Sequence, residues 1–429
     1  MQNSVNKFFI YLFFFILLIN CSLSKKETSN QNEDIKIIFQ KLKPIEKELN
    51  PNLNIQLQKL TKGKPFLRNN TNNSGNINFE TNFDNLSSFK FKKIDQFEFN
   101  QPELLFTDSN SIIFFDGKGA IFNINEELNV NWKVNHYTKK ERKLNPILYF
   151  AQNGKNLIVA DNISKFYSLN LNNGDMIWSN SNQSPFNSNI KIYKNRFLAI
   201  DFDNVIRCFS LEDGSEIWNF KTEDSFIKSQ KKLSLALKGE IVYFINNLGD
   251  VTSLNINDGS LIWQTPTQSN VIYQNAFSLE NSDLVFANNS IYFSNNKNEI
   301  FSIDSKSGIV KWKQTVNSSL RPTIIENLIF SISEEGYVFV LDDKTGNILK
   351  ITNALRNIKD KKNKIKPTGF VIAKNKIYLS LNNGRLIKID VLTGLQENIY
   401  KIHGSKISRP YILNGNMYLI KSNGIVKSN

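Results

Sequence analysis

A Gly-x-x-x-Trp motif recurs along the chain at nearly regular intervals. It occurs as LNNGDMIW (171–178), LEDGSEIW (211–218), INDGSLIW (256–263) and DSKSGIVKW (304–312). The paired residues are Gly174 and Trp178, Gly214 and Trp218, Gly259 and Trp263, and Gly308 and Trp312. A fixed period of this kind is typical of repeat architectures, and it decides the fold before any other pattern is considered.

Three further copies extend the series. DKTGNILK (343–350) and VLTGLQEN (391–398) keep the glycine but place Lys350 and Asn398 where the tryptophan would stand, and Trp132 ends EELNVNW without the glycine. From position 132, the tryptophan-equivalent positions are separated by 46, 40, 45, 49, 38 and 48 residues. A unit of this length matches one four-stranded blade of a β-propeller.

Each unit has the pattern of an antiparallel sheet. Strands of alternating polarity, such as YVFVLDD and RLIKIDV, are separated by turns rich in Asn, Asp and Gly. This alternation indicates β-hairpins. The units span residues 105–132, 146–178, 188–218, 234–263, 281–312, 321–350 and 367–398, and a truncated eighth spans 409–429.

The truncated unit lacks one strand, which SFKFKKIDQFEFN (88–100) can supply from the other end of the domain. Such pairing would close the ring and protect the edges of the sheets. The sequence therefore predicts an all-β, eight-bladed propeller of four-stranded antiparallel blades over residues 86–429, closed by an N-terminal strand. Seven blades are the alternative. We expect the tryptophans to fill the apolar layers between blades.

The N-terminal residues predict export. Lys7 precedes an uninterrupted apolar run from Phe8 to Ile19, which is too short to span a bilayer and fits a signal peptide. The run ends at LINC, which resembles the lipobox of bacterial lipoproteins, although Asn20 departs from the usual small residue. We expect a signal peptide over residues 1–20 and lipidation of Cys21. An ordinary signal peptide with an incidental cysteine is the alternative.

Residues 21–85 are expected to form a flexible tether after the lipidated cysteine. DIKIIFQKLKPIEKEL is compatible with one short helix interrupted by Pro44. The Asn-rich stretch RNNTNNSGNINFETNFDN has too few apolar residues to build a core.

Charge and composition narrow the range of sites. The net charge is +14, which suits an acidic protein, an acidic membrane surface or no single partner, but no basic cluster lies between stacking aromatics, so we expect no nucleic-acid binding. Cys208 is the one thiol besides Cys21 and is predicted to be a small apolar strand residue. His136 and His403 have no second ligand at metal spacing, so no metal site is expected.

The Gly-x-x-x-Trp motif closing a unit of about 40 residues resembles the repeat of quinoprotein dehydrogenases and their non-catalytic relatives. Among these relatives, an exported and lipidated eight-bladed chain is similar to the BamB family of outer-membrane protein assembly factors. The resemblance covers residues 100–429. It implies a non-enzymatic scaffold without a cofactor, held as a monomer within a complex on the periplasmic face of the outer membrane. Its partner would be a BamA-like β-barrel assembly subunit, on whose POTRA domains it docks to aid insertion of outer-membrane proteins.

The resemblance also implies where the partner binds. In the family the binding patch lies in loops between blades on one face of the ring, which by position correspond to SFIKSQKK (225–232) and LENSD (279–283). The residues implied are Ile227, Gln230, Lys231 and Asn281. The family's Leu-x-Leu-Arg and Asp-x-Asp patterns are not reproduced there, and ordinary solvated connections are the alternative.

Two other functions are compatible with the fold. A periplasmic dehydrogenase dependent on pyrroloquinoline quinone would need Ca²⁺ ligands, an acidic base and, in that family, a vicinal cysteine pair. The chain has no adjacent cysteines, and Asp201 and Asp203 fit a polar turn as well as they fit Ca²⁺ ligands. A propeller that binds another periplasmic protein or a glycan is the other alternative, because one fold supports many functions.

Overall fold

The computed structural model describes residues 49–50, 52–53, 55–62, 64, 66–67, 69–81, 83–97, 102–223, 228–229, 231–267, 279–358 and 364–428. The chain divides into two units, Met1–Lys43 and Pro44–Asn429, and the second is described below. The predicted signal peptide, Cys21 and the predicted helix around Pro44 lie outside the described residues. In the described part, no helix has the length and apolar character needed to cross a membrane.

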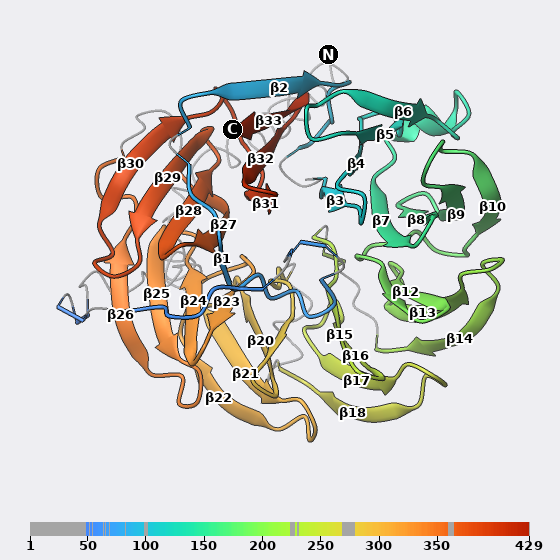
Figure 1. Ribbon diagram of the computed structural model, residues 1–429. Coiled ribbons are helices and arrows are strands. Elements are labelled where there is room, and N and C mark those ends of the chain that lie inside the picture. The colour runs from blue at the N-terminus through green and yellow to red at the C-terminus, as the bar shows by residue number, and fades with distance from the viewer. Residues whose placement is uncertain are drawn as a thin grey trace, which may run out of the picture. The chain divides into compact units, whose positions relative to one another are not determined.

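The second unit is an eight-bladed β-propeller (Figure 1). Each blade contains four antiparallel strands, and in blades 1 to 7 the innermost strand comes first in the chain. This is the predicted fold, with eight blades and not seven. The loop that enters a blade and the turn that joins its first two strands lie at opposite ends of the innermost strand. These loops and turns therefore lie on opposite faces of the ring.

Blades 1 to 4 follow one another in chain order. Blade 1 contains β3 (Leu105–Phe106), β4 (Ile112–Phe115), β5 (Ile121–Ile124) and β6 (Val130–Val134). The 3-10 helix η1 (Glu141–Leu144) follows it. Blade 2 contains β7 (Leu148–Asn153), β8 (Asn156–Asp161), β9 (Lys165–Asn170) and β10 (Met176–Ser181). Blade 3 contains β11 (Lys191–Tyr193), β12 (Arg196–Ile200), β13 (Val205–Ser210) and β14 (Glu216–Lys221). Blade 4 contains β15 (Leu235–Lys238), β16 (Ile241–Ile245), β17 (Val251–Asn255) and β18 (Leu261–Thr265).

Blades 5 to 8 complete the ring. Blade 5 contains β19 (Val285–Ala287), β20 (Ser290–Asn295), β21 (Glu299–Asp304) and β22 (Val310–Gln314). Blade 6 contains β23 (Thr323–Ile325), β24 (Leu328–Ile332), β25 (Tyr337–Asp342) and β26 (Ile348–Asn353). Blade 7 contains β27 (Pro367–Ala373), β28 (Lys376–Leu381), β29 (Arg385–Asp390) and β30 (Gln396–Lys401). Blade 8 contains β31 (Tyr411–Leu413), β32 (Asn416–Lys421) and β33 (Gly424–Ser428), with β2 (Leu86–Lys90) as its outermost strand.

The pairing of β2 with β33 closes the ring, as the sequence predicts. The two strands are antiparallel, with a register from Leu86 opposite Ser428 to Lys90 opposite Gly424. The closing strand therefore begins two residues before the predicted segment 88–100. Because β2 covers the outer edge of β33, blade 8 has the same four strands as its neighbours.

Hydrophobic clusters fill the interfaces between neighbouring blades. Between blades 2 and 3, for example, Ile158 and Phe166 pack with Phe197 and Phe209. Every blade has a neighbour on both sides, so its middle strands bury both faces. This explains the continuous apolar runs of strands such as β4 and β12, because burial of apolar surface is the main stabilising contribution.

Five tryptophans link consecutive blades. Each lies on an outermost strand, and its Nε1 donates to a backbone carbonyl of the next blade, at distances between 2.7 and 3.2 Å. The pairs are Trp132 with Leu171, Trp178 with Leu211, Trp218 with Ile256, Trp263 with Ser305 and Trp312 with Asp343. The indoles therefore lie between blades, where they combine apolar contact with a satisfied N–H group.

Lys350 replaces the tryptophan in blade 6. Its Nζ donates to the carbonyls of Leu392 and Thr393 in blade 7 at 3.1 and 2.9 Å, and the residue is 3% exposed. An ammonium group thus makes the same kind of link as an indole. Asn398, at the equivalent position of blade 7, is exposed. Blade 8, which follows blade 7, takes its outermost strand from β2. In blade 8, therefore, no turn joins the third strand, β33, to the outermost strand.

The described residues before β2 pack against the propeller, contrary to the predicted flexible tether. Ile55 and Leu57 are buried in the cluster between blades 6 and 7, and Phe79 and Phe83 are buried in the cluster between blades 7 and 8. The apolar residues in this segment are few, but they are spaced so that one pair reaches each of two interfaces. This part of the segment therefore belongs to the folded domain.

Residues 69–77, here called the inner segment, run along the innermost strands of blades 4 to 7, and they are the blue trace near the centre of Figure 1. Leu237 of β15 donates its backbone N–H to the carbonyl of Asn70 at 2.8 Å, and Phe286 of β19 donates to the carbonyl of Thr71 at 3.0 Å. These bonds satisfy inner-edge amides that the blades themselves leave without a partner.

The inner segment continues along blades 6 and 7. The side chain of Asn73 exchanges hydrogen bonds with the backbone of Ile324 in β23, at 2.9 and 3.1 Å. Its last residues form β1 (Asn76–Ile77), which pairs in parallel with β27 and adds a fifth strand to blade 7. The inner segment therefore bonds to the innermost strands of blades 4 to 7 in chain order.

Candidate functional site

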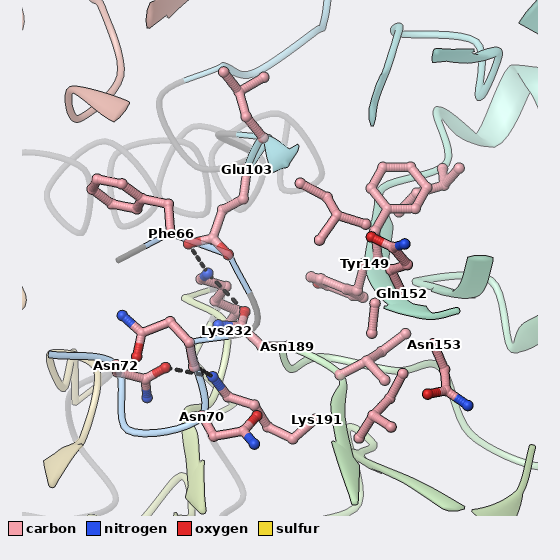
Figure 2. Close-up of a pocket in the computed structure, with 18 of the residues that line it drawn as sticks. Phe66, Asn70, Asn72, Glu103, Tyr149, Gln152, Asn153, Asn189, Lys191 and Lys232 are labelled. Atoms are coloured by element: carbon pink, nitrogen blue, oxygen red, sulfur yellow. Dashed lines mark hydrogen bonds and ion pairs between the residues drawn. The ribbon is translucent and has the colours of Figure 1, made fainter. Parts of the chain in front are cut away.

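A cavity of ≈ 350 Å³ lies beside the inner segment, among the innermost strands of blades 1 to 3 (Figure 2). The inner segment covers the inner strands of blades 4 to 7, and the cavity borders those that it leaves open. One wall is formed by residues 147–153 of blade 2, and another by residues 189–192 of blade 3. Asn70 and Lys194, which also line the cavity, are exposed to solvent.

The two sides of the cavity differ in chemistry. Leu148, Tyr149 and Phe150 give the blade 2 side an apolar character. The opposite side carries Lys191 and Lys232 (Figure 2). The cavity can therefore hold a group that is apolar on one side and polar or charged on the other.

Asn72 connects the cavity wall to three blades. The residue is 2% exposed, and its Nδ2 donates to the carbonyls of Leu235 and Leu284 at 2.8 and 2.7 Å. Its Oδ1 accepts from Lys191 Nζ at 2.6 Å. A single amide thus satisfies polar groups of blades 3, 4 and 5, which only a side chain with both a donor and an acceptor can do.

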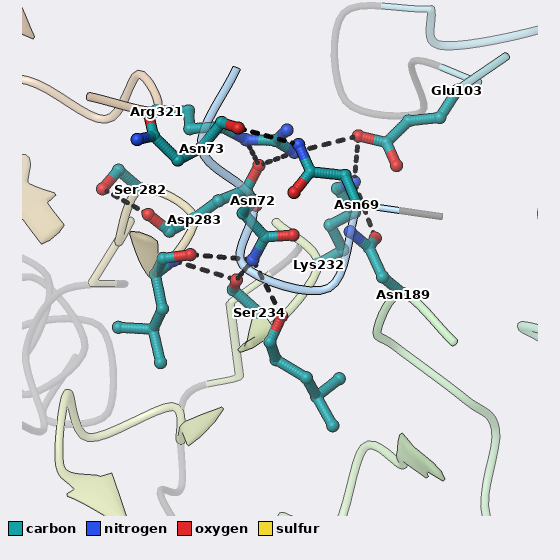
Figure 3. A network of polar contacts seen from close by, with 12 residues as sticks. Asn69, Asn72, Asn73, Glu103, Asn189, Lys232, Ser234, Ser282, Asp283 and Arg321 are labelled. Atoms are coloured by element: carbon teal, nitrogen blue, oxygen red, sulfur yellow. Dashed lines mark hydrogen bonds and ion pairs between the residues drawn. The ribbon is translucent and has the colours of Figure 1, made fainter. Parts of the chain in front are cut away.

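A charged network adjoins the cavity (Figure 3). Arg321 Nε donates to Asp283 Oδ2 at 2.6 Å, and an Arg321 terminal nitrogen lies 3.6 Å from Glu103 Oε1. Lys232 Nζ lies 2.5 Å from Glu103 Oε1 and donates to Asn189 Oδ1 at 2.7 Å. These residues come from the segments that enter blades 1, 3, 4, 5 and 6, so the network ties together parts of the chain that are far apart in sequence.

The positive charges of the network lower the pKa values of both of its carboxylates. Burial alone would raise the pKa of Asp283, but the positive charges of Arg321 and Lys232 outweigh it and lower that pKa. The pKa of Glu103 is likewise lowered, because Lys232 and Arg321 outweigh the effect of burial. Paired charges of this kind hold their positions, since breaking a buried pair leaves an uncompensated charge.

Lys191 lies next to this network, and no carboxylate of the described residues pairs with it. It is 8% exposed, and its Nζ donates to Asn72 Oδ1 and to the carbonyl of Asn69. Burial lowers the pKa of Lys191 to about 7, and the positive charge of Arg321 adds to this effect. Among the described charged residues that line the cavity, four are basic and one, Glu103, is acidic. Two carboxylates outside the lining also pair with these cations, Asp283 with Arg321 and Glu240 with Lys194.

The structure places two of the four residues predicted to bind a partner. Lys231 is partly buried, its Nζ donates to the carbonyl of Ser319, and burial lowers its pKa to about 8. Asn281 is 8% exposed and forms a β-bridge with Asn295. Both lie in segments that enter a blade, on one face of the ring. Ile227 and Gln230 lie outside the described residues.

Asp201 and Asp203 form a hairpin turn. Asp201 Oδ1 accepts from the amides of Asp203 and Val205 at 3.0 and 3.1 Å, and its Oδ2 accepts from Arg207 Nε at 2.9 Å. The same turn, with a side chain accepting from the second and fourth following amides, recurs at Asp116, Asp161, Asn246 and Asn295. This repetition favours the interpretation of Asp201 as a turn residue.

The remaining candidates have structural surroundings. Cys208 lies in β13 and is fully buried, and burial raises its pKa to about 12. His136 Nε2 lies 3.1 Å from the carbonyl of Gly174, and His403 Nδ1 contacts Ser405. No group of three His, Cys, Asp or Glu side chains with the arrangement of a metal site occurs among the described residues.

The cavity and its charged network were not predicted from the sequence. One signal was available, because RPTII (321–325) and RPYIL (409–413) place an arginine at the same position before the innermost strands of blades 6 and 8. A basic residue repeated at the inner end of blades indicates charge near the centre of the ring. Nothing in the local sequence of Glu103, Lys191 or Asp283 shows that these residues meet there.

Solved structures with similar folds include the crystal structure of BamB from Moraxella catarrhalis. It has a TM-score of 0.61 and 14% sequence identity, covering 80% of this chain and 97% of that one. The computationally designed Ika8 protein has a TM-score of 0.58 and 15% identity, covering 79% and 99%. The C-terminal WD40 domain of Sif2 has a TM-score of 0.58 and 12% identity, covering 80% and 98%. At these identities the likeness concerns the fold alone.

Comparison of sequences gives a more specific result. No curated protein sequence matches the chain significantly. The family model described as outer membrane protein assembly factor BamB matches residues 121–352, which extend from β5 of blade 1 to β26 of blade 6. The match covers more than half of the 429 residues. This chain therefore belongs to the outer membrane protein assembly factor BamB family of PQQ-type repeat propellers.

Proposed function

We propose that the protein is a non-enzymatic scaffold lipoprotein of the machinery that assembles β-barrels in the outer membrane. It acts on the periplasmic face of that membrane, where a lipid on Cys21 anchors it, and it docks on the POTRA domains of a BamA-like subunit. The observation that carries the proposal is the match of residues 121–352 to the assembly-factor family. The lipobox-like LINC sequence at residues 18–21 supports the anchor.

The proposed docking surface is the face of the ring that carries the loops entering blades 4 and 5. Lys231 contacts Ser319, which precedes blade 6, so the segments that enter blades 4 and 6 are joined there. Glu280 is the exposed residue next to the buried Asn281. Buried residues position such a surface, whereas exposed residues make its contacts, so Glu280 joins Ile227 and Gln230 as a proposed contact.

Co-purification tests the docking proposal. The full-length chain, isolated from detergent-solubilised envelopes, is expected to carry a BamA-like subunit with it. The double variant Ile227→Asp/Glu280→Lys is expected to reduce recovery of that subunit at least tenfold. The matched control is Lys155→Glu, which changes an exposed residue in the β7–β8 turn on the opposite face and should leave recovery unchanged. Absence of the subunit from the unmodified sample would reject the proposal.

The lipid anchor and the absence of catalysis have separate tests. Radiolabelled palmitate is expected to enter the unmodified chain but not the Cys21→Ser variant, and incorporation in both would contradict anchoring at this residue. The purified chain, mixed with pyrroloquinoline quinone and Ca²⁺, is expected to bind no quinone in its absorption spectrum. A bound-quinone spectrum with dehydrogenase activity would support the enzyme alternative instead.

A further inference from the structure

The inner edges of the blades follow one rule in their hydrogen bonding. Each innermost strand of blades 2 to 7 ends at a two-residue hairpin, as between Asn153 and Asn156 in blade 2. In such a hairpin, the two residues that flank the turn form hydrogen bonds with each other within the sheet. The residue before the first of these two directs its amide away from the sheet, toward the centre of the ring. The residues at this position in blades 2 to 6 are Gln152, Ile192, Leu237, Phe286 and Ile324.

The inner segment already uses these amides in three blades. The amides of Leu237 and Phe286 donate to backbone carbonyls of the segment, and the amide of Ile324 donates to Asn73 Oδ1. In blade 7, Ile372 occupies the same position and lies opposite Asn76 in the β1–β27 pair. These edges therefore accept oxygens of a polypeptide that passes along them, and in blade 7 that polypeptide pairs as a strand.

Blades 2 and 3 present the same amides to the cavity. Within the described part of the chain, no acceptor is paired with the amide of Gln152 or of Ile192. Both residues line the ≈ 350 Å³ cavity, and the position of Gln152 is visible in Figure 2. An edge strand with free amides is a template for the addition of another strand.

Charge selects among the peptides that could enter. The cavity is lined by the lysines at positions 191, 194 and 232, by Arg321 and by the carboxylate of Glu103. Glu103 is already engaged by Lys232 and Arg321, whereas Lys191 is held by two neutral oxygens. Arg321 also pairs with Asp283, and Lys194 with Glu240, so among the described residues Lys191 is the cationic side chain of the cavity that no carboxylate balances. An acidic side chain entering the cavity would approach this group.

We propose that this cavity binds an extended, acidic segment of a partner protein, whose backbone carbonyls accept from Gln152 and Ile192 and whose carboxylates approach Lys191 and Lys232. The bound segment continues around blades 2 and 3 the course that the inner segment takes around blades 4 to 7. A small organic anion would use the lysines but leave the strand edges unpaired. This inference is independent of docking on a barrel subunit, because it concerns the purified chain alone.

Binding of a synthetic peptide tests the proposal. Fluorescence polarisation is measured with the full-length chain in detergent and labelled peptides of alternating sequence, VEVEVE and VKVKVK. The acidic peptide is expected to bind at least tenfold more tightly than the basic one, and added salt should weaken it. Two further probes distinguish strand addition from simple anion binding. One is an analogue of VEVEVE whose amides are N-methylated, and the other is citrate.

The expected result is that N-methylation weakens binding at least tenfold, because it prevents addition of a strand. Equal binding of the methylated and unmethylated peptides, or full competition by millimolar citrate, would overturn the proposal in favour of a simple anion site. Failure of any acidic peptide to bind would overturn it altogether.

A matched pair of variants tests the edge itself. Ile192→Pro removes the amide that faces the cavity while keeping the amides that pair with β12, and proline is tolerated at such edge positions. Ile192→Ala removes the same side chain but keeps the amide. The proline variant is expected to lose at least tenfold in affinity for VEVEVE, and the alanine variant less than threefold.

Equal affinities of the two folded variants would contradict strand addition at β11. If the proline variant does not fold, hydrogen exchange of the unmodified chain decides the question. The peptide is expected to slow exchange in segments covering residues 148–153 and 191–193, and protection confined to other segments would refute the assignment.

Discussion

Glycine and tryptophan recur together because they touch across the interface between blades. A Cβ atom added to Gly259 would lie 2.7 Å from Trp218 of the preceding blade, and one added to Gly308 would lie 2.6 Å from Trp263. Leu128 occupies the glycine position of blade 1 with a φ of 66°, because the preceding blade 8 takes its outermost strand from β2, LSSFK, which carries no tryptophan. The glycine is therefore required for close approach of the indole, and not only for its positive φ.

Alanine substitution at two glycines separates the effect of the positive φ from the effect of the close contact with the indole. Gly259→Ala introduces both an unfavourable φ of 74° and a clash with Trp218, so we expect a loss of about 2–4 kcal/mol in the free energy of unfolding. Gly415→Ala has a similar φ of 77° but nothing within 4 Å of the new atom, and should cost only about 1–2 kcal/mol. Urea unfolding measures both, and equal losses would show that the contact with the indole is unimportant.

The tryptophans should contribute chiefly through packing. Trp218→Ala removes the ring that lies between blades 3 and 4, and is expected to cost about 3–5 kcal/mol. Trp218→Phe keeps most of that contact but loses the bond from Nε1 to the carbonyl of Ile256, which adds about 1 kcal/mol to the cost of the smaller ring. A loss below about 0.5 kcal/mol for Trp218→Ala in the same denaturant experiment would refute a role between the blades.

Among the elements of the fold, the repeated strands were predictable and the inner segment was not. The strands of each blade carry their own signal, because apolar alternation and Asn/Asp-Gly turns are local properties. The inner segment, NNTNNSGNI (69–77), is polar and would be disordered by itself. It is ordered because its asparagine side chains and backbone carbonyls bond to the inner edges of several blades, which local composition does not reveal.

The contribution of the inner segment to stability can be measured at Asn72. Asn72→Ala leaves the carbonyls of Leu235 and Leu284 without their donor, so we expect a loss of about 2–4 kcal/mol. Asn70→Ala is the control, because its side chain is exposed and its backbone carbonyl, which accepts from Leu237, is retained. The control should change stability by less than about 0.5 kcal/mol in chemical unfolding. Similar losses in both variants would contradict the role assigned to Asn72.

For the molecule as a whole, the sequence predicted the ring, its eight blades and its closure from the two ends of the domain. These features follow from the number and spacing of the repeats. The charged network could not be predicted, because Glu103, Asp283 and Arg321 are brought together only by closure of the ring. The same limit applies to the predicted contact residues Lys231 and Asn281, whose burial depends on how neighbouring loops pack.

The buried charge at the centre should make stability depend on pH. Burial lowers the pKa of Lys191 to about 7, whereas an unfolded lysine titrates near 10.4. The unfolded state therefore binds more protons between about pH 7 and 10, so the free energy of unfolding should rise with pH in this window, by up to ~1.4 kcal/mol per unit.

Lys191→Met should flatten this rise when urea unfolding is repeated from about pH 7 to about pH 9.5. We expect a smaller slope to remain in the variant. It comes from Lys231, because burial lowers the pKa of Lys231 to about 8. Identical slopes for the variant and the unmodified chain would show that Lys191 is not the group responsible.

The pairing of β2 with β33 also bears on how the chain is made. A ribosome produces β2 before any strand of the seven preceding blades and β33 only after all of them, so blade 8 stays incomplete for almost the entire synthesis of the domain. A premature stop just before Gly424 would therefore leave seven finished blades and an open ring. Such a product would expose the edges of two strands together with the apolar faces on either side of the gap, and it would be a substrate for proteases and chaperones rather than a slightly shorter propeller.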